Sequence, residues 1–83
     1  MKYIVQKILK TKAKDILHSD SMRGAYELAK AMKLRYEGTS YIGVWPQFSG
    51  EDGCRYRIIL QHPLGMVCSP SKEDLSVFPN IIA

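Results

Sequence analysis

The side chains best suited to metal binding or nucleophilic catalysis are two cysteines and two histidines: Cys54, Cys68, His18 and His62. They are scattered along the chain, and neither a Cys-x-x-Cys nor a His-x-x-x-His motif occurs. A closed zinc site requires four ligands, usually in closely spaced pairs, and a catalytic cysteine requires a base and an orienting group. Glycine-rich phosphate-binding motifs are absent too. We therefore expect no metal, no cofactor and no catalytic site, and we predict that the chain is not an enzyme.

Arginine and aromatic side chains form the group that points most clearly to binding: Tyr41, Trp45, Arg55 and Arg57. We expect strands over residues 40–45 and 54–61, and side chains alternate between the two faces of a strand. Both arginines then share one face of their strand, and both aromatic residues share one face of the neighbouring strand. The pattern predicts that the four stand together on the open side of a sheet.

Such a group supports three interpretations. Tryptophan, tyrosine and arginine dominate protein-binding hot spots, so our leading hypothesis is a non-enzymatic module that binds a protein or nucleoprotein complex. Aromatic rings can also stack on bases while arginines hold phosphates, which makes direct binding of DNA or RNA the alternative. The third interpretation is an ordinary solvated sheet face on which arginine stems lie over aromatic rings.

A second basic group consists of Lys30, Lys33 and Arg35. We expect these residues at the end of a helix. The group is a secondary candidate for binding an acidic partner. Its ordinary explanation is that cations interact favourably with the negative end of the helix dipole.

One helix is predicted over about residues 21–35. Ser19, Asp20 and Ser21 are suitable N-cap residues, and apolar residues follow at alternating spacings of three and four: Met22, Ala25, Ala29, Met32 and Tyr36. Gly38 is the expected stop.

Strands are predicted on both sides of this helix. Residues 3–9 are rich in β-branched and aromatic side chains, and residues 14–18 form either a returning strand or part of a competing helix over 5–17. After the helix we expect the strand over 40–45, ended by Pro46, then a polar loop, the strand over 54–61 and a short strand over 66–68. The segment from Ser69 to Leu75 can form one capped helical turn.

Taken together, these elements predict a single α+β domain over residues 1–83, with the order β(β)αβββ. An antiparallel sheet of three to five strands would carry the helix on one face. The apolar tail over residues 77–82 must dock on this body or on another copy of the chain, and the second case would make a homo-oligomer.

The composition limits the classes of protein to which this chain can belong. The chain has 83 residues and a net charge of +4, with 46% hydrophobic and 24% charged residues, which are ordinary values for one globular domain. No apolar run approaches the roughly 18 residues that cross a bilayer. We therefore expect a soluble, cytoplasmic protein without a membrane partner.

The arrangement of the first 62 residues resembles that of small bacteriophage proteins that inhibit a host machine, such as anti-CRISPR proteins and inhibitors of bacterial RNA polymerase. The similarity lies in a basic opening strand (Met-Lys-Tyr-Ile-Val-Gln-Lys-Ile-Leu), one short helix (Ser-Met-Arg-Gly-Ala-Tyr-Glu-Leu-Ala-Lys-Ala-Met) and a following strand pair. The resemblance implies a non-catalytic binder that blocks its partner by occlusion. Many such inhibitors are acidic DNA mimics, and the charge of +4 departs from that pattern.

Overall fold

The computed structural model describes residues 1–39 and 45–79 of the chain. Six strands and two short helices follow one another in these residues: β1 (Lys2–Ile8), β2 (Ala13–Ser19), α1 (Met22–Ala31), β3 (Arg35–Thr39), β4 (Pro46–Ser49), β5 (Arg55–Gln61), β6 (Val67–Cys68) and α2 (Lys72–Leu75). The expected α+β class is confirmed. The sheet has more strands than the three to five predicted, and a second short helix accompanies the first.

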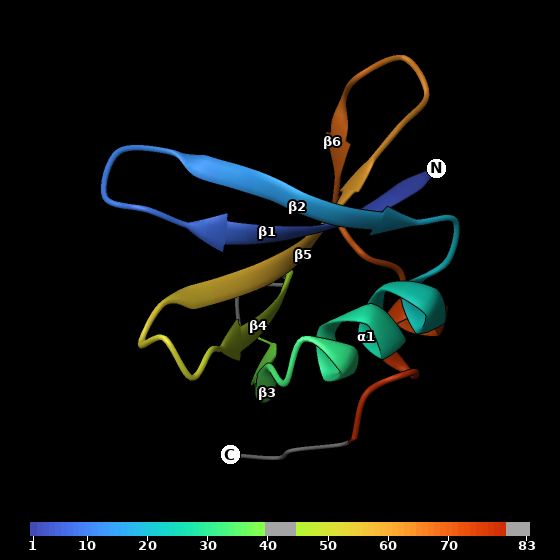
Figure 1. The fold of residues 1–83 in the computed structure, drawn as a ribbon. Coiled ribbons are helices and arrows are strands. Elements are labelled where there is room, and N and C mark those ends of the chain that lie inside the picture. Colours follow the sequence, from blue (N-terminus) through green and yellow to red (C-terminus); the bar gives the residue numbers. More distant parts are fainter. Residues whose placement is uncertain (40–44, 80–83) are drawn as a thin grey trace.

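Strand β5 lies at the centre of the sheet, whose order is β2-β1-β5-β4-β3 with every neighbouring pair antiparallel (Figure 1). One edge of β5 pairs with β1 along its whole length. The other edge is shared, because β4 pairs with residues 55–57 and β6 pairs with residues 60–61. Strands β4 and β6 therefore leave a gap between them along this edge of β5.

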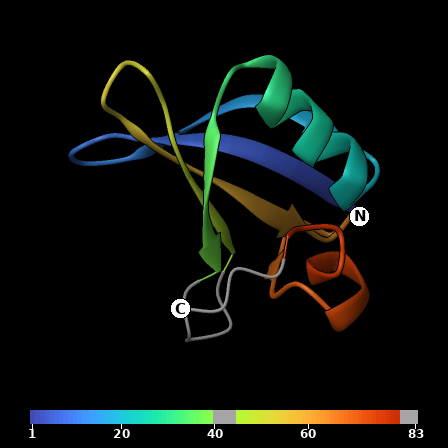
Figure 2. The same cartoon turned by 90° about the horizontal axis from the view of Figure 1, so that it is seen from below.

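The core lies between one face of the sheet and α1, which covers that face in both views (Figures 1 and 2). Alternation along β5 directs Tyr56, Ile58 and Leu60 into this core. From α1 the buried residues Met22, Ala25 and Ala29 meet them. These three residues belong to the apolar stripe that the sequence predicts, so α1 packs on one sheet face over a shorter range than predicted.

The N-terminal segment is a β-hairpin, which decides between the two alternatives that the sequence leaves open for residues 3–18. Strands β1 and β2 pair from Tyr3 with Ser19 to Ile8 with Ala13, and an irregularity at Val5 and Gln6 leaves Ile16 as an extra residue in β2. Strand β1 is stable in this form because both of its edges are paired. A helix over the same residues could not bury Val5 and Ile58 side by side.

The end of α1 corrects the predicted helix of residues 21–35. The helix starts where expected, with the Ser21 side chain accepting a hydrogen bond from the Gly24 amide at 3.0 Å, but it stops at Ala31. Lys33 has a φ of 61°, and the amides of Lys33 and Leu34 donate to the carbonyls of Lys30 and Ala29. This is a Schellman motif, with a lysine where glycine is usual. It turns the chain so that Leu34 is buried, and Tyr36 therefore belongs to β3 and not to the helix.

Strand β4 corrects a second prediction. Residues 46–53 were expected to be a loop that begins where Pro46 ends a strand, yet Pro46 is the first residue of β4. Phe48 explains the strand, because its ring is 1% exposed and its backbone pairs with Tyr56 of β5. Most of the strand predicted over 40–45 lies outside the described residues. The predictions for β5, β6 and the capped turn at α2 are confirmed, the last by a capping box between Ser71 and Asp74.

The apolar tail docks on its own chain as far as the structure describes it. Phe78 is buried against Tyr26 and Tyr36, with ring centroids 4.7 and 4.8 Å away, and Val77 packs against the same core. Residues 80–83 lie outside the described part, and the homo-oligomer stays a prediction. No helix in the described ranges is long and apolar enough to cross a bilayer.

Replacing Lys33 by glycine should stabilise the protein. A left-handed backbone conformation costs a residue with a side chain about 1 kcal/mol, and glycine avoids that cost although it loses more backbone entropy on folding. We expect Lys33→Gly to raise the urea midpoint, and Lys33→Val, with a β-branched side chain, to lower it. Equal midpoints for the two variants would contradict the left-handed cap.

Replacing Phe78 by alanine should lower the free energy of unfolding by about 3 kcal/mol, because a buried ring is lost and its neighbours cannot fill the space. Leu64→Ala is the control, since Leu64 is 81% exposed and its loss should cost less than about 0.5 kcal/mol. Urea denaturation of both variants measures the difference. If the two changes cost the same, the tail does not dock on the core.

Candidate functional site

The sheet face opposite α1, called the far face below, carries the polar side chains that the central strands direct away from the core. Gln6 of β1 lies directly opposite Arg57 of β5 on one side and Asp15 of β2 on the other. Side chains that lie opposite each other in an antiparallel pair are in contact distance on the same face. Three neighbouring strands thus bring Asp15, Gln6 and Arg57 into one row.

Hydrogen bonds join this row end to end. The Arg57 Nε donates to Gln6 Oε1 at 2.9 Å, and Gln6 Nε2 donates to Asp15 Oδ1 at 2.7 Å. An amide is the side chain that fits the middle position, because it offers an acceptor to the arginine and a donor to the carboxylate. Among the described residues, Gln6 stands out as a buried polar residue that is only 8% exposed. Its two bonds satisfy it and fix the guanidinium of Arg57.

Trp45 extends the row across the gap between β4 and β6. Its ring lies under the guanidinium of Arg57, whose Cζ atom is 5.2 Å from the ring centroid. Its indole Nε1 donates to the Cys68 carbonyl at 2.8 Å, just at the end of β6. The indole therefore ties two strands that do not pair with each other, while one ring face holds a cation. We call Asp15, Gln6, Arg57 and Trp45 the far-face ladder.

The structure brings together part of the predicted quartet. Trp45, which directly precedes β4, is in contact with Arg57. Arg55 lies two residues along the same face of β5, is exposed, and takes part in no ion pair among residues 1–39 and 45–79. Tyr41 lies outside the described residues, so its place in the quartet stays a prediction.

Gln6 and Asp15 are the members of the ladder that sequence reasoning missed. A signal for Gln6 exists, because it stands between Ile4 and Ile8 on one face of an apolar strand, where an unpaired amide would be costly. The identity of its partners could not be read from the sequence, since Gln6 and Arg57 are 51 positions apart.

The ladder is suited to binding and not to proton transfer. Arg57 uses Nε inside the ladder, and its planar guanidinium has further donors that can bind a carboxylate or phosphate. Because Gln6 and Trp45 already fix the side chain, a partner that binds it costs little additional side-chain entropy. Arg55 adds a second cation that forms no ion pair among the described residues, although Glu37 lines the same hollow.

The second basic group is divided by the end of the helix. Lys30 lies in the last turn of α1, pairs with Glu27 at 2.9 Å and stands 4.6 Å from the centroid of the Tyr26 ring. Arg35 belongs to β3 and pairs with Glu37 at 3.3 Å, while Lys33 is exposed in the turn between them. Exposed pairs of this kind contribute about 0–1 kcal/mol. Neighbouring carboxylates thus offset two of the three charges, which makes the group a weaker candidate than the far face.

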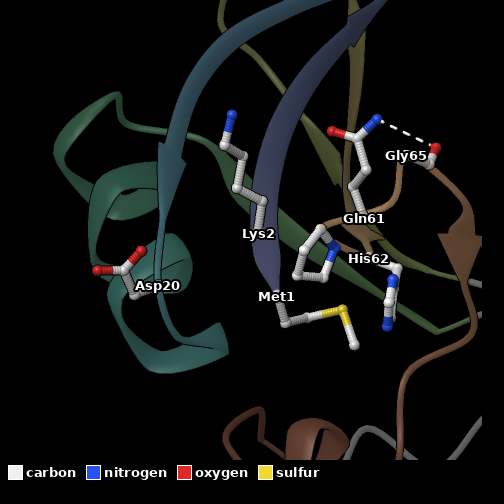
Figure 3. Close-up of a pocket in the computed structure, with 7 residues that line it drawn as sticks. Met1, Lys2, Asp20, Gln61, His62 and Gly65 are labelled. Atoms are coloured by element: carbon white, nitrogen blue, oxygen red, sulfur yellow. Dashed lines mark hydrogen bonds between the residues drawn. The ribbon is translucent and has the colours of Figure 1, made fainter.

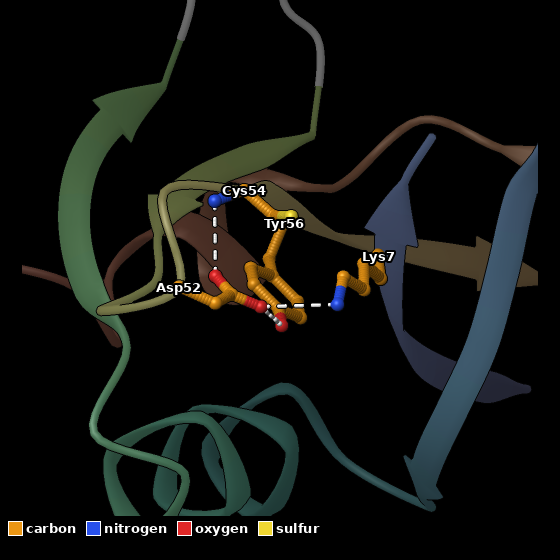
Figure 4. A network of polar contacts seen from close by, with 4 residues as sticks. All are labelled: Lys7, Asp52, Cys54 and Tyr56. Atoms are coloured by element: carbon orange, nitrogen blue, oxygen red, sulfur yellow. Dashed lines mark hydrogen bonds and ion pairs between the residues drawn. The ribbon is translucent and has the colours of Figure 1, made fainter. Parts of the chain in front are cut away.

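A separate polar network surrounds Asp52 in the connection between β4 and β5 (Figure 4). One carboxylate oxygen accepts from the Cys54 amide at 2.9 Å, and the other accepts from the Tyr56 hydroxyl at 2.8 Å and pairs with Lys7 Nζ at 3.0 Å. Gly50 leaves the space for this arrangement, since an added Cβ would lie 2.6 Å from the carboxylate and 2.7 Å from the Tyr56 ring.

The network holds its groups in their ordinary charge states. The Cys54 amide, followed by Tyr56 and Lys7, lowers the pKa of Asp52 far below its usual value. The hydrogen bond to Asp52 raises the pKa of Lys7, and burial followed by that carboxylate raises the pKa of Tyr56. No member is moved toward neutral pH, where a general acid or base would be tuned. Asp52 therefore fastens the β4–β5 connection to β1.

A hollow of about 440 Å³ lies at the opposite end of β1 (Figure 3), lined by Met1, Lys2, Asp20, Gln61, His62, Pro63 and Gly65. The hydrogen bond drawn there joins Gln61 Nε2 to the Gly65 carbonyl at 3.3 Å and stays within the β5–β6 turn. Asp20 and His62 stand on opposite sides of the view and do not converge on one point. The lining therefore offers no combination of groups that suggests a reaction.

Comparisons with protein-family models, with curated proteins and with solved structures gave no match. Within the described ranges, no three histidine, cysteine, aspartate or glutamate side chains gather closely enough to hold a metal ion. Interpretation of the site consequently depends on the geometry of the far face.

Replacing Asp52 by asparagine should destabilise the protein in a pH-dependent way. A carboxyl group whose pKa is lowered by folding contributes stability above its unfolded pKa, which is near 3.8, and loses that contribution as the pH falls further. The urea midpoint of Asp52→Asn should lie below that of the wild type at about pH 7 and approach it below about pH 3.

Glu51→Gln is the matched control, because it removes an exposed carboxylate from the same connection. Its midpoint should follow that of the wild type throughout the titration. A gap between wild type and Asp52→Asn that does not change with pH would contradict the electrostatic role of Asp52.

Proposed function

We propose that this chain is a non-catalytic binding module whose far face engages a protein or nucleoprotein complex. The observation that carries the proposal is the arginine–tryptophan pair of the far-face ladder, in which Gln6 holds Arg57 over Trp45. Beside it, Arg55 is exposed and without an ion-pair partner among the described residues. A rigid aromatic and cationic surface of this kind favours an acidic partner.

The same features favour a protein surface over free nucleic acid at this face. Arginine and tryptophan are the residues most often found at protein hot spots. One face of the Trp45 ring is already occupied by Arg57, so a base that stacked there would have to displace the guanidinium. Direct binding of DNA or RNA by the far face is the alternative, and it predicts a strong dependence on salt.

The proposed mechanism is occlusion, in which the module covers a functional surface of its partner in the manner of the phage inhibitors that the sequence resembles. It requires only a fixed surface, and the ladder supplies one because each of its side chains is held by at least one contact inside the protein. No step of this mechanism needs a cofactor.

A capture experiment tests the proposal. Tagged wild-type protein and Arg55→Ala/Arg57→Ala are incubated with lysate of the native host, with and without nuclease. We expect the wild type to retain a stoichiometric protein partner after nuclease treatment, and the double variant to bind that partner at least 10-fold more weakly.

The matched control is Arg23→Ala/Lys72→Ala, which removes two exposed cations from the helices and not from the far face, and should leave binding unchanged. Thermal unfolding first confirms that both variants fold. If both pairs of substitutions weaken binding equally, general charge and not the far face is responsible. Capture that is lost with nuclease would favour the nucleic-acid alternative.

A further inference from the structure

The net charge of the protein resides in its first hairpin. Residues 2–19 contain five lysines and one carboxylate, whereas residues 20–83 contain seven lysines and arginines and seven carboxylates. The charge of +4 for the whole chain is therefore the charge of β1, β2 and their turn. The remainder of the chain is neutral.

Of the four hairpin lysines that form no ion pair with a described residue, three lie at and beside the tip, and Lys2 is exposed at the other end of β1. Lys7 pairs with Asp52, and Asp15, the acidic residue of the hairpin, is bound by Gln6. Lys10, Lys12 and Lys14 are exposed and form no ion pair with any described residue. These three lysines are called the basic arm below.

The shape of the hairpin presents the basic arm to a partner. The turn is closed by a hydrogen bond from the Leu9 amide to the Lys12 carbonyl at 2.8 Å, and the hairpin tip projects away from α1 and the body of the domain (Figure 1). Strand β5 begins opposite Ile8, where β1 ends, and β2 begins at Ala13, so the turn of residues 9–12 is the end of a hairpin that extends beyond the third strand. The major groove of DNA admits a two-stranded ribbon of this kind, with phosphates on both sides.

We infer that the basic arm is a second binding site, which contacts the phosphates of duplex DNA. Lysine is a flexible point charge that gains little at a protein surface exposed to water. Against DNA, each lysine that neutralises a phosphate releases condensed counterions, and that release drives binding.

Binding by the basic arm should be independent of DNA sequence. Residues 9–14 contain no arginine, asparagine or glutamine, whose planar groups form paired hydrogen bonds with bases, and the lysines present are flexible point charges suited to phosphates. Three phosphate contacts predict a slope of about −2.7 in a plot of log affinity against log salt, or roughly a 40-fold loss between 50 and 200 mM.

The basic arm and the far face use different residues, so either site can fail without the other. The test is fluorescence anisotropy of a labelled duplex DNA of about 20 base pairs, titrated at several salt concentrations. Lys10→Gln/Lys12→Gln/Lys14→Gln is compared with Lys2→Gln/Arg23→Gln/Lys72→Gln, which lowers the net charge by the same amount at exposed positions outside the basic arm. Lys10→Gln/Lys12→Gln leaves β2 untouched and serves if the triple variant unfolds.

We expect the basic-arm variant to lose at least 10-fold in affinity and about one unit of salt slope for each lysine removed, and the control to stay within about threefold of the wild type. Single-stranded DNA and duplex RNA of equal length should bind more weakly than duplex DNA. The inference would be overturned if the wild type did not bind at 50 mM salt, or if the two triple variants lost affinity equally. It would also be overturned if only Arg55→Ala/Arg57→Ala lost affinity.

Discussion

The pairing of β5 on both of its edges is the constraint on which the rest of the structure depends. Because β1 occupies one edge and β4 and β6 share the other, the side chains of β5 serve two surfaces at once. Its inward residues meet α1 in the core, and its outward residues form the middle of the far face. A break in this strand would therefore disturb both the core packing and the candidate binding site. The pairing that fixes the position of Ile58 in the core also fixes the position of Arg57 on the far face.

Local signals in the sequence predict the elements that are stabilised by contacts between residues close together in the chain. The cap at Ser21, the apolar stripe that follows it and the alternation along β5 all agree with the structure. The end of α1 could not be predicted from the glycine rule, because a lysine adopts the left-handed turn so that Leu34 can be buried. Strand β4 could not be predicted either, because its residues have the local pattern of a loop. Pairing with β5 and the burial of Phe48 make these residues a strand.

The candidate sites show the same difference between features with a local sequence signal and features that depend on long-range contacts. Alternation alone places Arg55 and Arg57 on one face, whereas the contact of Arg57 with Trp45 is given by the fold. The amide that holds Arg57 comes from the other end of the chain, and pairing over that separation has no local signal. The charge of the hairpin, by contrast, could be found by counting charges along the sequence. The fold shows which of these charges are unpaired, because Asp52 pairs with Lys7 and leaves Lys2 at one end of the hairpin and the basic arm at the other.

The register between β1 and β5 also orders the events of folding. The paired residues lie far apart in the sequence: Ile8 and Arg55 are 47 positions apart, and Lys2 and Gln61 are 59 positions apart. During synthesis the β1–β2 hairpin can close first, because its contacts are local, but β1 keeps an unpaired edge until β5 has emerged. Long-range pairing of this kind slows folding and leaves strand edges open to other chains. The lysines spaced along the hairpin then have a further effect, because like charges keep nascent copies apart while the central strand is still missing.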